Sequence, residues 1–241
     1  MNAVQAFSTK AMILAAGLGT RLRPITDSIP KALVTIDGQT LLEGAIRHLA
    51  DYGVTEIIIN IHHFADQILQ FLGHNHNFGL DITISDERNK LLDTGGGLNN
   101  VSRFFAGGKP FFVRNVDIVS DLDLHNMMEQ HLKSHALATL AVRNRKTSRY
   151  FLFDPDHRLC GWTNLKTGEN ILSIESKMNL EMLAFSGIQV LSPEIFTLIT
   201  EEGKFSLTSL YLRLAKDHFI KGFQDRGSIW RDVGKSIGEI D

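Results

Sequence analysis

Two glycines followed by cations stand near the start of the chain. Residues 11–31 read AMILAAGLGTRLRPITDSIPK, in which an apolar run leads into Gly17 and Gly19, with Arg21 and Lys31 beyond them. Glycine permits positive φ and lets backbone N–H groups approach a phosphate chain, while arginine and lysine supply full positive charge. The types and spacing of these residues therefore predict a loop that binds phosphate.

Two common phosphate-binding patterns do not fit this loop. The dinucleotide fingerprint G-x-G-x-x-G requires a third glycine where Leu22 stands, and Pro24 follows soon after. The pattern G-x-x-x-x-G-K-[ST] requires wider spacing than that between Gly17 and Gly19. A glycine turn with solvated basic residues is the remaining alternative, but it gives no reason for a proline directly before the lysine.

The elements that must position this loop follow from hydrophobic periodicity. Segments of helical period separate most of the Val- and Ile-rich runs, which predicts parallel strands joined by crossover helices. The predicted strands are residues 11–16, 56–61, 80–85 and 110–113. The predicted helices are residues 39–52, 63–72 and 123–134. We predict an α/β fold that is Rossmann-like and doubly wound, with a mostly parallel mixed sheet flanked by helices.

The second half of the chain has a different pattern. Beyond about Leu137 the extended runs are shorter, and the turn sequence DPDHR predicts hairpins beside the main sheet or extending it. Two helical segments follow near residues 193–200 and 207–216. Because no linker or repeat interrupts the 241 residues, we expect a single domain over 1–241, divided into halves at 1–135 and 136–241.

Composition excludes several classes of function. The chain has 25 basic and 27 acidic residues and a net charge of -2, so nothing indicates a nucleic-acid or membrane partner. Cys160 is the only cysteine, which excludes an internal disulfide and fits a reducing compartment. Apolar runs are too short to span a membrane, and MNAVQAFSTK does not resemble a secretory signal. We expect a cytoplasmic protein.

The loop also resembles the signature of the sugar-1-phosphate nucleotidyltransferases. In that family G-x-G-T-R is followed by a proline, a threonine and a P-K pair. The matching residues are Gly17, Gly19, Thr20, Arg21, Pro24, Thr26, Pro30 and Lys31. RNVDIVSD resembles the family's N-G-D at a strand end, and GSIWRDVGK resembles its W-x-D-x-G-T-like segment. The resemblance extends over nearly the whole chain and implies a fold of the nucleotide-diphospho-sugar transferase type.

The resemblance implies an enzyme that transfers a nucleotidyl group from an NTP to a sugar 1-phosphate and releases pyrophosphate. It assigns Arg21 to the β- and γ-phosphates and Lys31 to the reacting phosphates. Asp117 and Asp232 become the ligands of Mg²⁺, in keeping with a hard cation held by few carboxylates plus substrate phosphates. The halves 1–135 and 136–241 become nucleotide-binding and sugar-binding.

Further site residues follow from the same resemblance. LLDTGGGL resembles the glycine-rich segment against the nucleobase and ribose, although a helix N-terminus capped by Asp93 or Thr94 remains an equal alternative. FSGIQVLSP resembles the strand whose glycine lies against the sugar, and Lys177 is the candidate for the sugar phosphate. The implied nucleotide-binding residues are Leu14, Ala15, Ala16, Gly17, Gly19, Thr20, Arg21, Gly95, Gly96 and Asn115, and the implied sugar-phosphate residues are Gly187 and Lys177.

Two departures from the family's motifs, together with the short length of the chain, refine the expected substrates. Val116 replaces the family's usual glycine in N-G-D, and SIESKMNLEML replaces its E-K-P segment. The compact members that the chain resembles are the N-acetylmuramate-1-phosphate uridylyltransferases of cell-wall sugar recycling, so UTP is the favoured nucleotide. A mannose-1-phosphate guanylyltransferase-like activity with GTP is the alternative. A non-catalytic nucleotide-binding regulatory subunit is a second alternative, and no pattern indicates an oligomeric state.

Overall fold

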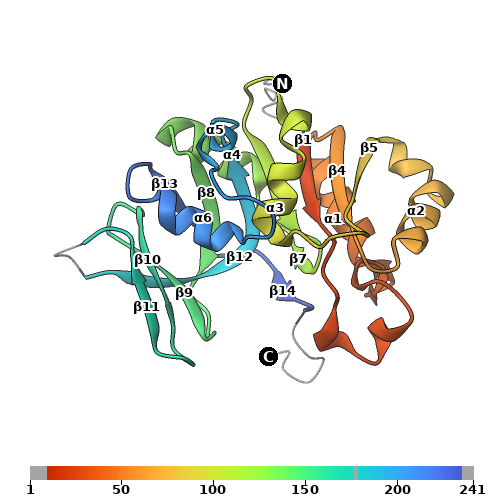
Figure 1. Cartoon of the computed structure of the whole chain (residues 1–241), viewed down its shortest axis with the longest axis horizontal. Coiled ribbons are helices and arrows are strands. Elements are labelled where there is room, and N and C mark those ends of the chain that lie inside the picture. The colour runs from red at the N-terminus through yellow and green to blue at the C-terminus, as the bar shows by residue number, and fades with distance from the viewer. Residues whose placement is uncertain (1–9, 176–178, 235–241) are drawn as a thin grey trace.

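The computed structural model describes residues 10–175 and 179–234. One mixed sheet runs through both halves of this part of the chain, between two layers of helices (Figure 1). Its strands follow the order β11-β10-β9-β12-β6-β1-β4-β5, and β8 and β13 join it through β12. The predicted fold class, a mixed α/β sheet flanked by helices, is confirmed.

The parallel strands lie in the first half of the chain. β1 pairs in parallel with both β4 and β6, and β4 pairs with β5. The predicted strands at 56–61 and 80–85 agree with these elements to within a residue, whereas the fourth strand continues two residues past the predicted end. The bounds are β1 Lys10–Leu14, β4 Glu56–Ile61, β5 Asp81–Asp86 and β6 Phe111–Asn115.

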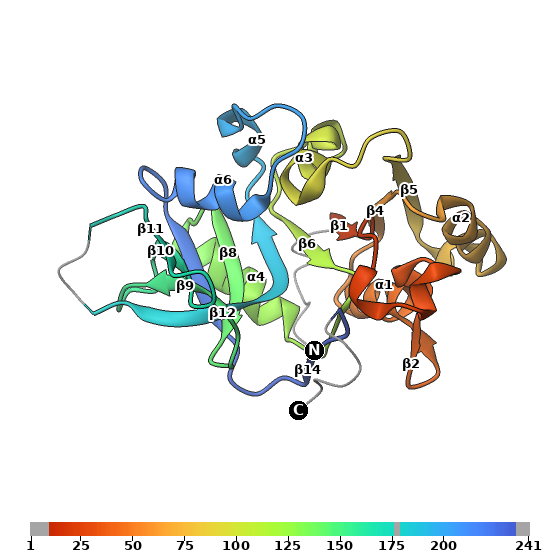
Figure 2. The same ribbon diagram turned by 60° about the horizontal axis from the view of Figure 1, so that its bottom comes forward.

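Antiparallel strands extend the sheet in the second half. The DPDHR turn joins β9 to β10, which confirms the predicted hairpin. Figure 2 shows β12 as a long, bent strand that passes from the side of β6 toward β9, and its register shifts between Phe185 and Gln189. The bounds are β8 Ala138–Arg143, β9 Arg149–Phe153, β10 Leu159–Asn164, β11 Glu169–Leu172, β12 Glu181–Leu191 and β13 Ile220–Gln224.

Successive side chains of each strand point to opposite faces of the sheet, so the hydrophobic core is divided into two layers. Ala11 and Ile13 of β1 face the layer of α1, α2 and α4, while Met12 faces α3, α5 and α6. The predicted helices at 39–52, 63–72 and 123–134 correspond to α1, α2 and α4. The bounds are α1 Leu41–Asp51, α2 Ala65–His74, α3 Asp93–Asn100, α4 Leu124–Ser134, α5 Ile195–Leu198 and α6 Leu207–Leu214.

Two short ladders lie outside the main sheet, and sequence periodicity predicted neither. β7 (Ile118–Ser120) follows β6 almost directly and pairs antiparallel with β14 (Trp230–Asp232). β2 (Thr35–Ile36) pairs with β3 (Gln39–Thr40) before α1. The β7–β14 ladder matters for the site, because it brings residues near 230 to the end of β6. None of the helices in the described part of the chain is long and apolar enough to cross a membrane.

Candidate active site at the ends of the parallel strands

A cleft of about 420 Å³ opens at the carboxyl ends of β1 and β6. Leu14 is the last residue of β1, Asn115 is the last residue of β6, and both line the cleft. β1 lies between β4 and β6, so the crossover connections leave the sheet in opposite directions at this point. Crevices at such switch points are the usual ligand sites of open α/β sheets.

The glycine loop after β1 is held by close packing around Gly19. This residue has φ 66°, and its carbonyl accepts hydrogen bonds from the Thr26 hydroxyl at 2.8 Å and from the Leu22 N–H at 2.8 Å. A Cβ at Gly19 would lie 3.0 Å from both Lys31 Cβ and Thr26 Cγ2. Glycine is therefore required both by the positive φ and by the approach of the threonine and the lysine of the motif.

A buried polar network supports the start of the same loop. Asn60, at the end of β4, accepts a hydrogen bond from the Ala15 N–H at 2.8 Å and donates one to Glu87 Oε1 at 2.8 Å. Glu87 Oε2 accepts the N–H of Leu92, directly before α3. Asn60 and Glu87 are both 3% exposed and both line the cleft. Sequence reasoning missed them, although Asn60 is the polar residue that interrupts the apolar run of β4.

Two carboxylates and one ammonium group converge at the rim of the cleft. Lys31 forms an ion pair with Asp117, and their side chains are 11% and 14% exposed. The β7–β14 register places Asp232 opposite Ile118, and the Val233 N–H donates to the Asp117 carbonyl at 3.0 Å. The two aspartates, which are distant in the sequence, therefore lie beside each other.

Gly234 marks the point where these charges meet. A Cβ built on it would lie 2.5 Å from Asp117 Oδ2, 2.6 Å from Lys31 Nζ and 2.9 Å from Asp232 Oδ1. Its N–H also donates to Asp232 Oδ1 at 2.9 Å. The glycine of the DVG sequence thus leaves room for three charged groups around one position.

The donor set at this position fits a divalent cation of the Mg²⁺ type. One oxygen from each aspartate faces the same small volume, and carboxylate oxygens are the ligands that Mg²⁺ prefers. Among the described residues no group of three or more His, Cys, Asp or Glu side chains gathers in a metal-binding arrangement. Two carboxylates without a closed cage suit a metal whose remaining ligands are water and substrate phosphates.

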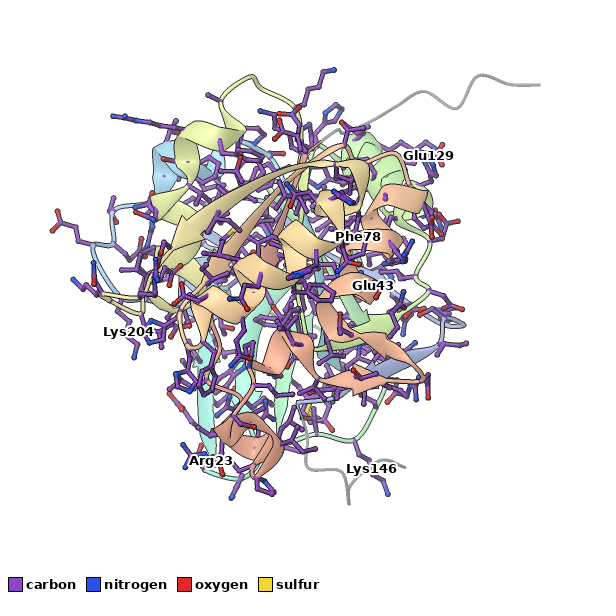
Figure 3. All side chains as sticks on the ribbon, turned by 90° about the vertical axis from the view of Figure 1, so that its right-hand side faces the viewer. Arg23, Glu43, Phe78, Glu129, Lys146 and Lys204 are labelled. Atoms are coloured by element: carbon purple, nitrogen blue, oxygen red, sulfur yellow. The ribbon has the colours of Figure 1, made fainter. Side chains whose placement is uncertain are left out.

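The cations of the cleft differ in their surroundings. Arg21 is exposed on the short 3₁₀ helix Thr20–Leu22 and lines the cleft. Lys204 is exposed on the segment before α6, also lines the cleft, and is labelled in Figure 3; sequence reasoning did not identify it. The predicted residues that line the cleft are Leu14, Ala16, Gly17, Gly19, Thr20, Arg21, Lys31, Asn115 and Asp117.

Gly95 and Gly96 do not line the cleft, unlike the residues just named. Added Cβ atoms would lie 2.4 Å from the Phe205 ring and 2.2 Å from the Gly203 carbonyl oxygen, and both N–H groups donate to the Phe205 carbonyl. These glycines let α3 pack against the segment before α6. Asp93 and Thr94 of the same segment line the cleft, and the contact of Gly95 and Gly96 with the nucleotide stays a prediction.

The capping alternative for this segment is correct in position but not in mechanism. α3 begins at Asp93, which has φ 63°, and no side chain caps its N-terminus. Asp93 Oδ1 accepts from the adjacent Thr94 N–H at 2.6 Å, while Thr94 Oγ1 accepts from the Leu207 N–H at 2.9 Å. Thr94 therefore ties α3 to α6.

The residues predicted for the sugar side have different outcomes. Gly187 has φ 80°, and a Cβ there would lie 2.5 Å from Ile118 Cγ1 and 3.3 Å from Asn115 Nδ2, so β12 passes directly beside the turn that carries Asp117. Lys177 lies outside the described residues. The guanidinium of Arg145 lies over the ring of Trp230, with its Cζ 4.3 Å from the ring centroid.

Val116, the departure from N-G-D, lines the cleft but is almost fully buried. It is 3% exposed and belongs to the core layer of α1, α2 and α4. Its N–H donates to the Leu14 carbonyl at 3.1 Å, which joins the ends of β6 and β1. The β-branched residue therefore adds core packing next to Asn115 and Asp117.

Comparison with known proteins identifies the family of the chain. The family model of the nucleotidyl transferases matches residues 10–237. An N-acetylmuramate alpha-1-phosphate uridylyltransferase from Caulobacter vibrioides is 32% identical over 233 residues, covering 93% of this chain and 91% of that protein. A mannose-1-phosphate guanyltransferase from Gibberella zeae is 28% identical over 232 residues, and the match covers 94% of this chain and 61% of that protein.

Solved structures have the same fold. HddC from Yersinia pseudotuberculosis, complexed with GMP-PN, aligns with a TM-score of 0.74 at 24% identity, covering 94% of each chain. The match of the family model spans both the glycine loop and Asp232, so it includes Arg21, Lys31, Asp117 and Asp232. The chain belongs to the nucleotidyl transferase family.

Proposed function

We propose that this nucleotidyl transferase acts on a sugar 1-phosphate, and that it transfers a uridylyl group from UTP to N-acetylmuramate 1-phosphate with release of pyrophosphate. The observation that supports nucleotidyl transfer is the convergence of Lys31, Asp117 and Asp232 beside the glycine loop. The similarity to an N-acetylmuramate alpha-1-phosphate uridylyltransferase over more than nine-tenths of both chains supports the choice of base and sugar.

The reaction needs no nucleophile from the protein. An oxygen of the sugar phosphate, already ionised at neutral pH, forms a bond to the α-phosphorus of the nucleotide. The bond from that phosphorus to the oxygen bridging to the β-phosphate breaks, and pyrophosphate leaves with the electron pair. The protein therefore has to position two anionic substrates and to stabilise the charge that develops between them.

The cations of the cleft match these requirements. Arg21, exposed at the cleft and with a planar fork of donors, is our choice for the β- and γ-phosphates and for the leaving pyrophosphate. Lys31, held beside Asp117, is a compact charge for the α-phosphate and the incoming phosphate. The loop amides from Gly17 to Thr20 are candidates for the remaining phosphate oxygens.

Asp117 and Asp232 would hold the Mg²⁺ ion. When bound, the ion would supply Lewis acidity and charge neutralisation at the phosphates. The Lys31 ammonium keeps the site from accumulating uncompensated negative charge before the ion arrives, because it already pairs with Asp117.

The direct test is pyrophosphate release. The purified protein is mixed with Mg²⁺, one of UTP, GTP, CTP or dTTP, and one of N-acetylmuramate 1-phosphate, mannose 1-phosphate or glucose 1-phosphate. We expect the highest kcat/KM with UTP and N-acetylmuramate 1-phosphate. Greater activity with GTP and mannose 1-phosphate would support the guanylyltransferase alternative, and silence across the panel would refute the proposal.

An Asp117→Asn variant tests the role of the carboxylate itself. The amide occupies the same volume but carries no charge for the metal, so we expect turnover to fall by about a hundredfold or more with the fold retained. Circular dichroism and thermal unfolding check the fold. A regulatory subunit without catalysis would bind nucleotide in a thermal-shift titration yet give no pyrophosphate, with or without the substitution.

A further inference from the structure

Arg114 is a fully buried cation directly before the cleft residues of β6. It is 1% exposed, in a strand that is otherwise apolar up to Asn115. Its Nη2 donates to the Ile118 carbonyl at 2.6 Å, and its Nη1 contacts His48 Nδ1 at 2.7 Å. The guanidinium thus reaches forward along the chain, past Asp117, and across to α1.

His48 extends this contact to a second point on the same segment. Its Nε2 lies 3.0 Å from the Leu122 carbonyl oxygen, to which it can only donate. Burial lowers the pKa of His48 to about 4, so the ring is neutral at pH 7. Nδ1 therefore accepts from Arg114 while Nε2–H donates to Leu122, and both ring nitrogens are satisfied.

The two side chains hold one short segment at two points. Residues 115–122, which we call the aspartate segment, contain Asn115, Asp117 and the strand β7. Arg114 binds it at Ile118, and His48 binds it at Leu122. Because α1 carries His48, the segment is fixed to the helical layer and not only to the sheet.

The cost of this arrangement argues for a role beyond packing. No carboxylate forms an ion pair with Arg114 within the described part of the chain, and its buried Nε has no hydrogen-bond partner there. Burial lowers the pKa of Arg114 to about 10, while the charge of Asp117 acts in the opposite direction. A buried cation without a paired carboxylate is expensive, whereas an apolar residue could fill the same space without that penalty.

We propose that Arg114 and His48 are positioning residues, which hold the aspartate segment so that the Asp117 carboxylate stays opposite Asp232 and beside Lys31. This inference rests on the proposed function for the identity of the metal site, but its geometry does not depend on which base or sugar is used. Loss of the hydrogen bonds from Arg114 and His48 should let Asp117 move away from the position that Gly234 leaves open. The ion, rather than the nucleotide, should then be held less tightly.

The experiment compares His48→Ala with a matched control, His131→Ala. His131 is buried, whereas His48 is partly buried. Like His48, it has a pKa lowered by burial to about 4 and joins two elements through both ring nitrogens, at Thr139 and Ser192. No hydrogen bond of His131 within the described residues reaches the aspartate segment. Arg114→Lys and Arg114→Met complete the set. Lysine keeps the positive charge but lacks the two separate Nη donors, and methionine lacks both.

Two measurements are made on the full chain, in addition to steady-state kinetics. Mn²⁺ serves as a paramagnetic probe of the metal site, with binding followed by electron paramagnetic resonance. Hydrogen exchange reports the protection of the amides of Val116 and Leu122, which are hydrogen-bonded to Leu14 O and Ser120 Oγ. Each variant is first checked for cooperative unfolding; His48→Gln and His131→Gln replace an alanine variant that does not fold, and the two Arg114 substitutions replace each other.

For His48→Ala we expect Mn²⁺ affinity and kcat each to fall about tenfold, as for loss of one hydrogen bond to a charged group, with KM for the nucleotide within about twofold. The aspartate-segment amides should exchange at least about tenfold faster. Arg114→Lys should fall between wild type and Arg114→Met. His131→Ala should lower stability but leave the Mn²⁺ affinity and these amides unchanged.

Equal effects of the His48 and His131 substitutions on Mn²⁺ affinity and on the exchange rates of the aspartate segment would refute the positioning role of Arg114 and His48. Other results would refute the proposed function instead. If Asp117→Asn binds Mn²⁺ as well as wild type does, the metal assignment is wrong, and the exchange data alone decide whether Arg114 and His48 order the segment. If no substrate pair turns over, the ion and exchange measurements still stand.

Discussion

Replacing Gly234 with alanine tests the convergence of charges with a single methyl group. The added Cβ would enter the space bounded by Asp117 Oδ2 at 2.5 Å, Lys31 Nζ at 2.6 Å and Asp232 Oδ1 at 2.9 Å. Gly234 does not have positive φ, so the substitution brings no backbone strain of that kind. The methyl group therefore perturbs the site by its volume alone.

The size of the effect follows from these distances. Ordinary contacts of a Cβ begin at about 3.4 Å, so the three charged atoms must each retreat by roughly half to one ångström. A misplacement of about 1 Å at a reacting centre costs on the order of a hundredfold in rate. We therefore expect kcat of Gly234→Ala to fall by about a hundredfold, with a change in unfolding free energy below about 1 kcal/mol because the charges are at the rim of the cleft.

The assay is steady-state pyrophosphate release with Mg²⁺ in excess, together with urea unfolding. Gly227→Ala is the matched control, since its added Cβ would have no neighbour within 4 Å and its φ is not positive. We expect the control to keep wild-type kcat. A Gly234→Ala enzyme with wild-type kcat and Mg²⁺ dependence would refute the reasoning, because the three groups could not then share the position that the structure gives them.

Three further predictions follow from the same geometry and burial. Asp232→Asn should reduce kcat by about a hundredfold and raise the Mg²⁺ concentration for half-maximal rate, which a metal titration checks. Gly187→Ala should lower the unfolding free energy by about 2–4 kcal/mol, as measured in urea, since it combines φ 80° with a Cβ 2.5 Å from Ile118 Cγ1. Because burial lowers the pKa of His131 from 6.5 to about 4, the unfolded chain takes up its proton first as pH falls. Stability should then decrease from about pH 6.5 toward pH 4, by about 2 kcal/mol between pH 7 and 5 from this group, and His131→Gln should remove that part of the slope in urea titrations.

Sequence patterns predicted the parallel half of the fold well because its signals are local. The strands at 56–61 and 80–85 and the helix ending near Gly53 are dictated by apolar periodicity, which burial in two layers requires. The β7–β14 ladder could not be found in this way. Each strand has three residues, too few to show a period, and their pairing depends on tertiary contacts between distant segments.

Arg21, Lys31, Asp117 and Asp232 were predicted from their types and from the resemblance, whereas Lys204 and the supporting residues of the loop were not. Asn60 and Glu87 act through buried hydrogen bonds to backbone N–H groups, and such partners cannot be read from a linear sequence. Gly95 and Gly96 were assigned to the nucleotide because glycine suits both ligand approach and close helix packing. The sequence does not distinguish these two demands, and the structure shows the close packing through the contact with Phe205.

The β7–β14 ladder has a consequence for how activity is acquired during folding. Asp117 lies between β6 of the main sheet and β7, but Asp232 reaches the site only when β14 adds to β7. A molecule with its large sheet already assembled can thus still be incompetent for catalysis. Enzymatic competence should appear as one of the last events of folding, after most of the spectroscopic signal of native structure has been regained.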